Sequence, residues 1–79
     1  MMTREIRLSN LEEVKRVVKI ASSCPLGVEA VDFLGHVADA SSILGIMALN
    51  CKQPLEVRSR DERSLQQICR ALDELHQAD

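Results

Sequence analysis

The chain has 79 residues, of which 46% are apolar, so it is long enough for one small domain with a modest core. Phe33 is its only aromatic residue, and its formal net charge is -2. The shortage of aromatic residues and the absence of a basic excess argue against nucleic-acid binding. No apolar run approaches the roughly 20 residues that a membrane-spanning helix needs, so we expect no membrane insertion.

The first residues carry charges and lack the apolar region of a signal peptide, so we expect a cytoplasmic protein. The three cysteines, Cys24, Cys51 and Cys69, are widely spaced, and neither histidine flanks a cysteine at metal-ligand spacing. We therefore expect no metal site and no cofactor. The cysteines are interpreted as small buried hydrophobic residues.

The chain begins with a predicted strand and helix. Residues 5–8 alternate between polar and apolar, as a half-buried strand does. A helix is predicted next, to about Ser23, and two capping pairs are possible at its start: Ser9 with Glu12, or Asn10 with Glu13. Its predicted apolar face consists of five residues at helical spacing: Leu11, Val14, Val17, Val18 and Ala21.

A hairpin is predicted after Pro25, which cannot continue the helix. The segment from Val28 to Leu34 is rich in residues that favour strands, and Val37 to Ala40 can pair back onto it. Gly35 and His36 lie between these two segments. His36 is therefore interpreted as an exposed polar residue on the turn.

A short helix is predicted in the stretch from Asp39 to Asn50, with Ser42 as its N-cap and Asn50 closing it in a left-handed conformation. Gly45 inside it is expected to permit a close approach to another backbone or to a partner. This helix is too apolar for a single buried face. The predicted core residues are Ile46 and Leu49, and the predicted exposed contact residues are Ile43, Leu44 and Met47.

The C-terminal part predicts one more strand and one more helix. Leu55 to Arg58 alternates again, and a helix begins near Asp61 with an apolar stripe of five residues: Leu65, Ile68, Cys69, Leu72 and Leu75. The predicted order is β-α-β-β-α-β-α. It favours a single α+β domain over residues 1–79, with a four-stranded antiparallel sheet and three helices on one face.

The segment Ser41-Ser-Ile-Leu-Gly-Ile-Met-Ala-Leu49, together with this element order, resembles HPr, the small phosphocarrier protein of the bacterial sugar phosphotransferase system. The resemblance implies the HPr-like open-faced sandwich. It places Ser42 at the serine that a dedicated HPr kinase phosphorylates in many Gram-positive bacteria, with Ser41, in place of the usual lysine, as a second candidate. It also places Ile43, Leu44 and Met47 on the apolar patch that contacts partner proteins.

One departure from the family concerns its chemistry. HPr carries its phosphoryl group on a histidine at the start of the first helix, in a Gly-x-His-Ala-Arg-Pro-like loop. The corresponding stretch here, Ser9-Asn-Leu-Glu-Glu13, contains no histidine, arginine, proline or glycine, and the loop is several residues shorter. The carboxylates of Glu12 and Glu13 would repel an incoming phosphoryl group. We therefore predict no phosphate transfer through histidine in the HPr manner and no catalytic residue.

Three hypotheses for the function follow. The first is a non-catalytic, HPr-like regulatory or protein-interaction module of the sugar phosphotransferase system or of carbon catabolite control, modified on Ser42. The second is an atypical phosphocarrier that uses Ser41, Ser42 or a cysteine. The third is an unrelated binding domain on the same fold. The sequence contains no glycine-rich phosphate loop, paired catalytic carboxylates or Ser-His-Asp set that would favour an enzyme.

Overall fold

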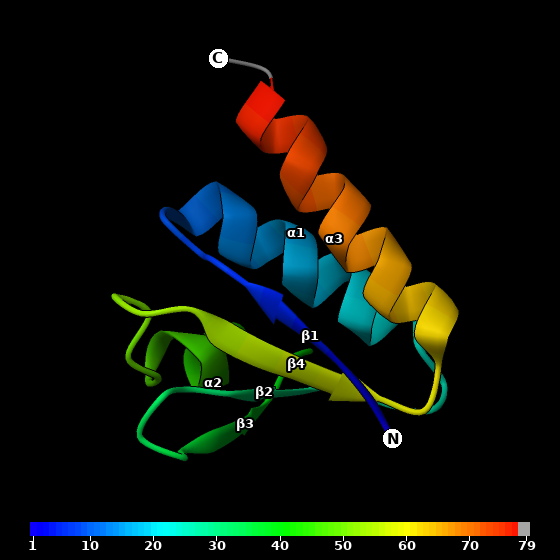
Figure 1. Cartoon of the computed structure of the whole chain (residues 1–79), viewed down its shortest axis with the longest axis horizontal. Helices are drawn as coiled ribbons and strands as arrows, with labels where there is room; N and C mark the ends of the chain where they lie inside the picture. The colour runs from blue at the N-terminus through cyan, green and yellow to red at the C-terminus, as the bar shows by residue number, and fades with distance from the viewer. Residues whose placement is uncertain (78–79) are drawn as a thin grey trace.

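The computed structural model describes residues 1–77. In chain order the elements are β1 (Met2–Ile6), α1 (Leu11–Ser22), β2 (Glu29–Val31), β3 (Val37–Asp39), α2 (Ile43–Met47), β4 (Leu55–Ser59) and α3 (Glu62–Gln77) (Figure 1). The predicted α+β class, with four antiparallel strands and three helices, is confirmed for this part of the chain. None of the helices within it is long and apolar enough to cross a membrane.

The four strands form one antiparallel sheet in the order β1-β4-β2-β3. Strand β4 lies between β1 and β2, with Met2 opposite Ser59 and Ala30 opposite Val57. Because successive side chains of a strand point to opposite faces, Val57 and Ser59 point to the buried face while the residue between them points to the other.

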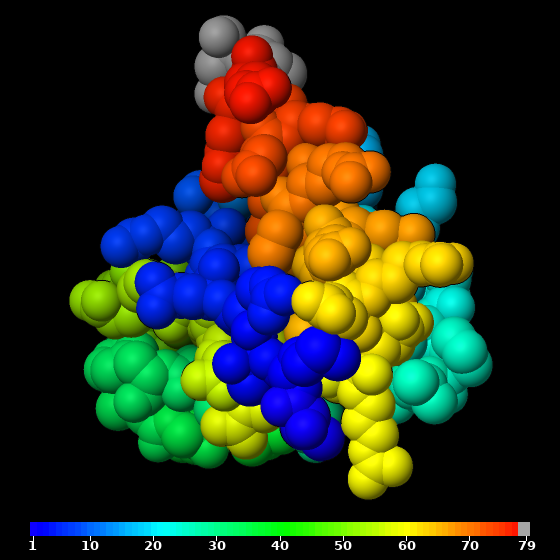
Figure 2. Space-filling view, turned by 45° about the vertical axis from the view of Figure 1, so that its right-hand side comes forward, coloured from blue at the N-terminus to red at the C-terminus, as the bar shows by residue number. Residues whose placement is uncertain are grey.

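The core lies between the sheet and the helices. Helices α1 and α3 pack against each other over one face of the sheet, and α2 contacts α1 and β3 (Figure 1). In Figure 2 the N-terminal strand, in blue, lies across the yellow residues of β4, and α3 rises above both. The most deeply buried large side chains are aliphatic and come from α1, α2, β4 and α3: Val17, Ile46, Leu55, Val57, Leu65 and Ile68.

Helix α1 begins with the second of the two predicted capping pairs. The side chain of Asn10 accepts a hydrogen bond from the backbone N–H of Glu13 at 2.9 Å. The buried carboxylate of Glu13 accepts one from the N–H of Ser9 at 2.8 Å. Leu11 is consequently the first helical residue and is 49% exposed, so its predicted burial is wrong, whereas Val14 is buried as predicted.

The hairpin turn depends on Asp32, which sequence reasoning treated as part of a strand. Its carboxylate accepts hydrogen bonds from the backbone N–H groups of Leu34 at 3.0 Å and His36 at 2.9 Å. Strand β2 therefore ends at Val31 rather than at the predicted Leu34. Gly35 has a φ of 88°, which a residue with a side chain rarely adopts, and this completes the turn.

The segment after α2 is also held by Asp32. The N–H of Asn50 donates to the Asp32 carboxylate at 3.0 Å. The pKa of Asp32 is lowered to about 2 by this bond and by the hydrogen bonds from the N–H of His36, the His36 imidazole and the N–H of Leu34. Asn50 does not close α2 in a left-handed conformation, because within residues 1–77 only glycines have a positive φ. That part of the sequence prediction is wrong.

Candidate functional site

The predicted N-cap of α2 is confirmed. The hydroxyl oxygen of Ser42 accepts a hydrogen bond from the N–H of Gly45 at 3.0 Å, and the backbone carbonyl of Ser42 accepts one from Ile46 at 3.0 Å. A Cβ atom on Gly45 would come within 3.2 Å of the Ser42 hydroxyl and 3.3 Å of the Ala38 side chain. The close neighbours of Gly45 are therefore side chains of β3 and of its own cap, rather than the other backbone that was expected.

The apolar side chains of α2 divide into a buried and an exposed set. Ile46 is 0% exposed and Leu49, just after the helix, is 8% exposed, so both belong to the core as predicted. Ile43, Leu44 and Met47 are 37%, 81% and 59% exposed. The predicted contact residues are therefore at the surface, although their role in binding stays a prediction.

Helix α1 adds a residue to this surface that sequence reasoning placed in the core. Leu11 and Met47 line one hollow of about 270 Å³ between the start of α1 and the end of α2. Leu49 and Cys51 also line it. We define the α2 patch as four exposed apolar residues: Leu11 and Met47, which line this hollow, and Ile43 and Leu44 of α2. The position of Leu11 in the first turn of the helix could have indicated its exposure, because the end of a helix extends beyond the centre of the core.

The two serines at the start of α2 differ in their hydrogen bonds. The Ser41 hydroxyl donates to the Asp39 carboxylate at 2.6 Å, and the Ser41 N–H donates to the same oxygen at 2.9 Å. These bonds lower the pKa of Asp39. A phosphate on Ser41 would remove the first bond and place negative charge beside Asp39. The Ser42 hydroxyl is half-buried and accepts the Gly45 N–H, a bond that a phosphate oxygen can also accept.

The start of α1 is where HPr-like chemistry would require a histidine. Here the Glu13 carboxylate, buried and bonded to the Ser9 N–H, occupies the first turn, and Glu12 is exposed beside it. The imidazole of His76 reaches this turn from α3, with Nε2 at 3.1 Å from the second Glu13 oxygen. This contact joins residues 63 positions apart, and no sequence signal predicted it. A carboxylate therefore stands between the imidazole and the helix N-terminus.

The thiols show no feature of a reactive or metal-binding site. Cys24 is buried, and its sulfur lies 3.7 Å from an oxygen of Asp61. Cys51 and Cys69 are half-buried, and burial raises the pKa of both thiols, with the charge of Asp32 raising that of Cys51 further. Within residues 1–77 no group of three or more histidine, cysteine or acidic side chains is placed to hold a metal ion.

His36 lies on the hairpin turn as predicted, and its ring is 68% exposed. Sequence reasoning missed its partner, since Nδ1 lies 3.1 Å from the Asp32 carboxylate. The contact adds to the bonds that hold the turn.

Comparison with models of known protein families finds no match for this chain, and comparison with curated proteins finds none either.

Proposed function

We propose that this protein is a non-catalytic, HPr-like interaction module that binds a partner protein through the α2 patch. The observation that carries the proposal is the exposure of Leu44 and Met47, 81% and 59%, on a helix of five residues. Large apolar side chains gathered at the surface are typical of protein-binding sites. The hollow beside Met47 and Leu11 offers a place for an apolar side chain of the partner.

The patch is held in a fixed position, which favours binding. Ile46 is buried at 0% exposure between the exposed residues of the same short helix. The Ser42 cap and the Asp32–Asn50 bond hold the two ends of the segment. The backbone that carries the patch is therefore held before binding, and less of the interaction energy would be spent on ordering it.

Phosphorylation of Ser42 is the regulatory part of the proposal, and it rests on the resemblance to HPr. A phosphate carries about -1.5 to -2 charges at neutral pH, and here it would lie next to Ile43. Such a charge at the edge of an apolar patch changes which partner surface can dock. The proposed setting is the sugar phosphotransferase system or carbon catabolite control in the cytoplasm, with an HPr kinase as the modifying enzyme.

Transfer of a phosphoryl group by this chain receives no support from the thiols or from the start of α1. Burial raises the pKa of Cys51, which reduces its thiolate fraction, and Glu13 occupies the first turn of α1 with a negative charge. The interaction module is therefore the function proposed.

Two purified proteins of the phosphotransferase system, its first enzyme and HPr kinase, serve as probes of the interaction. We expect their addition to shift backbone amide resonances of α2 in NMR spectra of the labelled protein, and Met47→Asp to abolish the shifts. Leu34→Asp is the matched control, because Leu34 is 59% exposed and lies outside the α2 patch. Equal binding by the two variants would exclude the patch as the contact surface.

Incubation with HPr kinase and ATP tests the regulatory part separately. We expect a mass increase that corresponds to one phosphate, located at Ser42 and absent from Ser42→Ala. If the protein binds a partner through the patch but takes no phosphate, the proposed interaction stands and the proposed regulation by phosphorylation is wrong.

A further inference from the structure

A second hollow adjoins the one that Leu11 and Met47 line. It has a volume of about 410 Å³, and its lining consists of Arg7, Leu8, Ser9, Cys51 and Lys52. Three of these residues, Leu8, Ser9 and Cys51, also line the hollow of about 270 Å³ beside Met47, so the two hollows form one groove. In Figure 1 the loop before α1, the loop before β4 and helix α2 all lie on the left-hand side of the molecule, and the groove is built from these segments.

The groove has positive charge at one end and apolar side chains at the other. Arg7 and Lys52 are exposed, and within residues 1–77 neither has an ion-pair partner. Leu11 and Met47 of the α2 patch lie at the other end. No aspartate or glutamate lines either hollow, and Glu12, exposed on the first turn of α1, is outside both linings.

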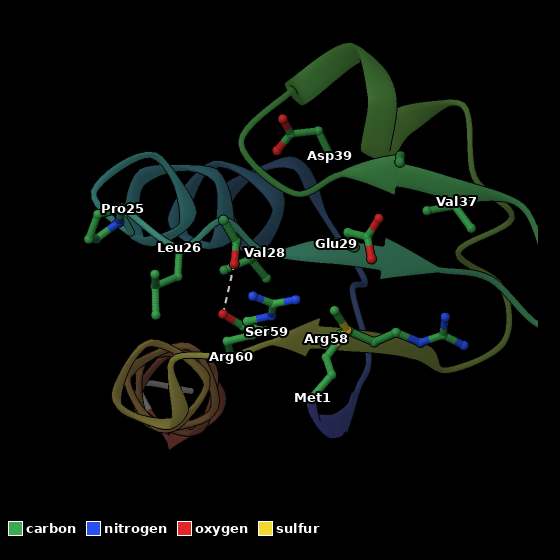
Figure 3. Close-up of a pocket in the computed structure, with 12 residues that line it drawn as sticks. Met1, Pro25, Leu26, Val28, Glu29, Val37, Asp39, Arg58, Ser59 and Arg60 are labelled. Atoms are coloured by element: carbon green, nitrogen blue, oxygen red, sulfur yellow. Dashed lines mark hydrogen bonds between the residues drawn. The ribbon is translucent and has the colours of Figure 1, made fainter.

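Three other hollows at the surface have linings of mixed charge. The hollow drawn in Figure 3 is lined by Glu29 and Asp39 and also by Arg58 and Arg60, and in this view Glu29 and Arg58 project from adjacent strands. Carboxylates and guanidinium groups together line each of the other two as well. Charges of opposite sign offset one another there, so these hollows favour no charged partner. The lining of the groove differs because its charged side chains are all positive.

The carboxylates close to the groove do not neutralise it by direct contact. Glu13 and Asp32 are buried, and each is bonded to donors of the chain other than Arg7. Glu5 and Asp73 share a separate hollow with Arg7, and neither forms an ion pair with it. The positive end of the groove therefore has hydrogen-bond donors to offer to a partner.

We propose that the occupant of this groove is an acidic segment of a partner protein, an inference that rests on the function proposed for the α2 patch and names the chemistry of its partner. An apolar side chain of the segment lies in the hollow between Leu11 and Met47. A neighbouring aspartate or glutamate lies at Arg7 and Lys52, where it accepts charge-assisted hydrogen bonds. Because the two hollows share lining residues, neighbouring residues of one segment reach both. The apolar contact supplies affinity, and the opposite charges fix the orientation of the segment.

Nucleic acids and anionic membrane surfaces also carry negative charge, but the groove suits them less well. A nucleic acid gains affinity by having several phosphates neutralised along its backbone. The groove supplies two cations and places an apolar hollow beside them. An acidic segment with an apolar side chain uses both ends of the groove, whereas a phosphate backbone uses one.

The test is an NMR titration of the labelled protein with a short synthetic peptide in which one leucine is flanked by glutamates. We expect saturable shifts at Arg7, Leu11, Met47 and Lys52 that weaken with added salt. A counterpart peptide with lysine in place of each glutamate should produce none. Absence of these shifts, or equal shifts with both peptides, would overturn the proposal. Stronger shifts with a short oligodeoxythymidine would overturn it too, in favour of nucleic acid.

The first enzyme and HPr kinase, used as probes above, distinguish the failure of this proposal from the failure of the proposed function. Shifts of Met47 with either protein, without any effect of the glutamate peptide, would leave the α2 patch as an interaction surface and exclude the acidic segment. Absence of shifts in the α2 patch with every probe would contradict both.

Variants of the two cations identify the contacts. Lys52→Gln and Arg7→Gln should each weaken binding of the glutamate peptide roughly threefold, as expected for the loss of one exposed charge contact, and the double variant roughly tenfold. Lys19→Gln makes the same charge change at an exposed position in the last turn of α1 and should bind as the wild type does. Leu11→Ser should weaken binding through the apolar end of the groove. Unchanged affinity in the double variant would contradict the assignment.

Discussion

The buried carboxylate of Asp32 accepts a hydrogen bond at 3.0 Å from the backbone N–H of Asn50, which is 18 positions further along the chain. This bond connects the β2–β3 turn to the segment that leaves α2. The same carboxylate accepts the N–H groups of Leu34 and His36. An ionised Asp32 thus holds the turn closed and positions the segment that follows the α2 patch.

The free energy of unfolding should decrease as the pH falls from about 4 to about 2. Asp32 has a pKa of about 2 in the folded protein, below the usual 3.8. A group with a lowered pKa stabilises the fold fully above its unfolded pKa, and this stabilisation is lost as the pH falls through the folded value. Urea unfolding at a series of pH values measures the effect, which Asp32→Asn should reduce and the exposed-site control Glu12→Gln should retain. An unchanged pH dependence in Asp32→Asn would contradict this assignment.

Replacing Ile46 by alanine should lower the free energy of unfolding far more than replacing Leu44, although both residues lie on the same short helix. Ile46→Ala should reduce the free energy of unfolding by about 3 kcal/mol, because it leaves a cavity at a site with 0% exposure. Leu44→Ala should change it by less than about 0.5 kcal/mol, because Leu44 is 81% exposed. Urea unfolding followed by circular dichroism distinguishes them, and similar losses in both would refute the division of α2 into core and surface.

The Ser42 cap should contribute measurably to stability. Ser42→Ala removes the acceptor of the Gly45 N–H and should cost about 1 kcal/mol, whereas Ser42→Asp keeps an acceptor and should cost less. Thermal unfolding of the two variants beside Ser41→Ala provides the measurement. A larger loss for Ser41→Ala than for Ser42→Ala would mean that the cap is assigned to the wrong serine.

Removing one negative charge from the β1–β4 strand pair, where Glu5 lies opposite Glu56, should stabilise the protein. Glu5→Gln relieves the repulsion across the β1–β4 ladder and should raise the free energy of unfolding by roughly 0.2–1 kcal/mol. The increase should shrink in high salt, and Glu74→Gln on α3 should show little change. A loss of stability in Glu5→Gln would show that the carboxylate makes a favourable contact in the free protein.

Local patterns predicted most of the architecture. Alternation identified β1 and β4, although β1 begins at Met2, ahead of the predicted Glu5. Helical spacing identified α1 and α3, and the Ser42 cap marked the start of α2. These features depend on neighbours within a few positions of one another, which is the range over which sequence periodicity carries information.

The errors arose where a distant contact decided the outcome. Asp32 ends β2 early and accepts the N–H of Asn50, and residue spacing reveals neither bond. Leu11 matched the apolar period of α1, yet its place at the end of the helix leaves it at the surface beside Met47. The opposition of Glu5 and Glu56 depends on the strand register, which no local pattern specified.

The position of β4 between β1 and β2 has a consequence for synthesis of the chain. Within residues 1–77, β1 pairs only with β4, and Met2 lies opposite Ser59. Strand β1 therefore cannot pair in the sheet until β4 has been synthesised. Pairing of β1 with β4 closes a long loop, and the entropy cost of that closure comes before the strands gain any hydrogen bonds. The contact is therefore slow to form. While the ribosome still holds β4, the β2–β3 hairpin is the only strand pair of this sheet that can form. The sheet is therefore completed only after β4 has emerged.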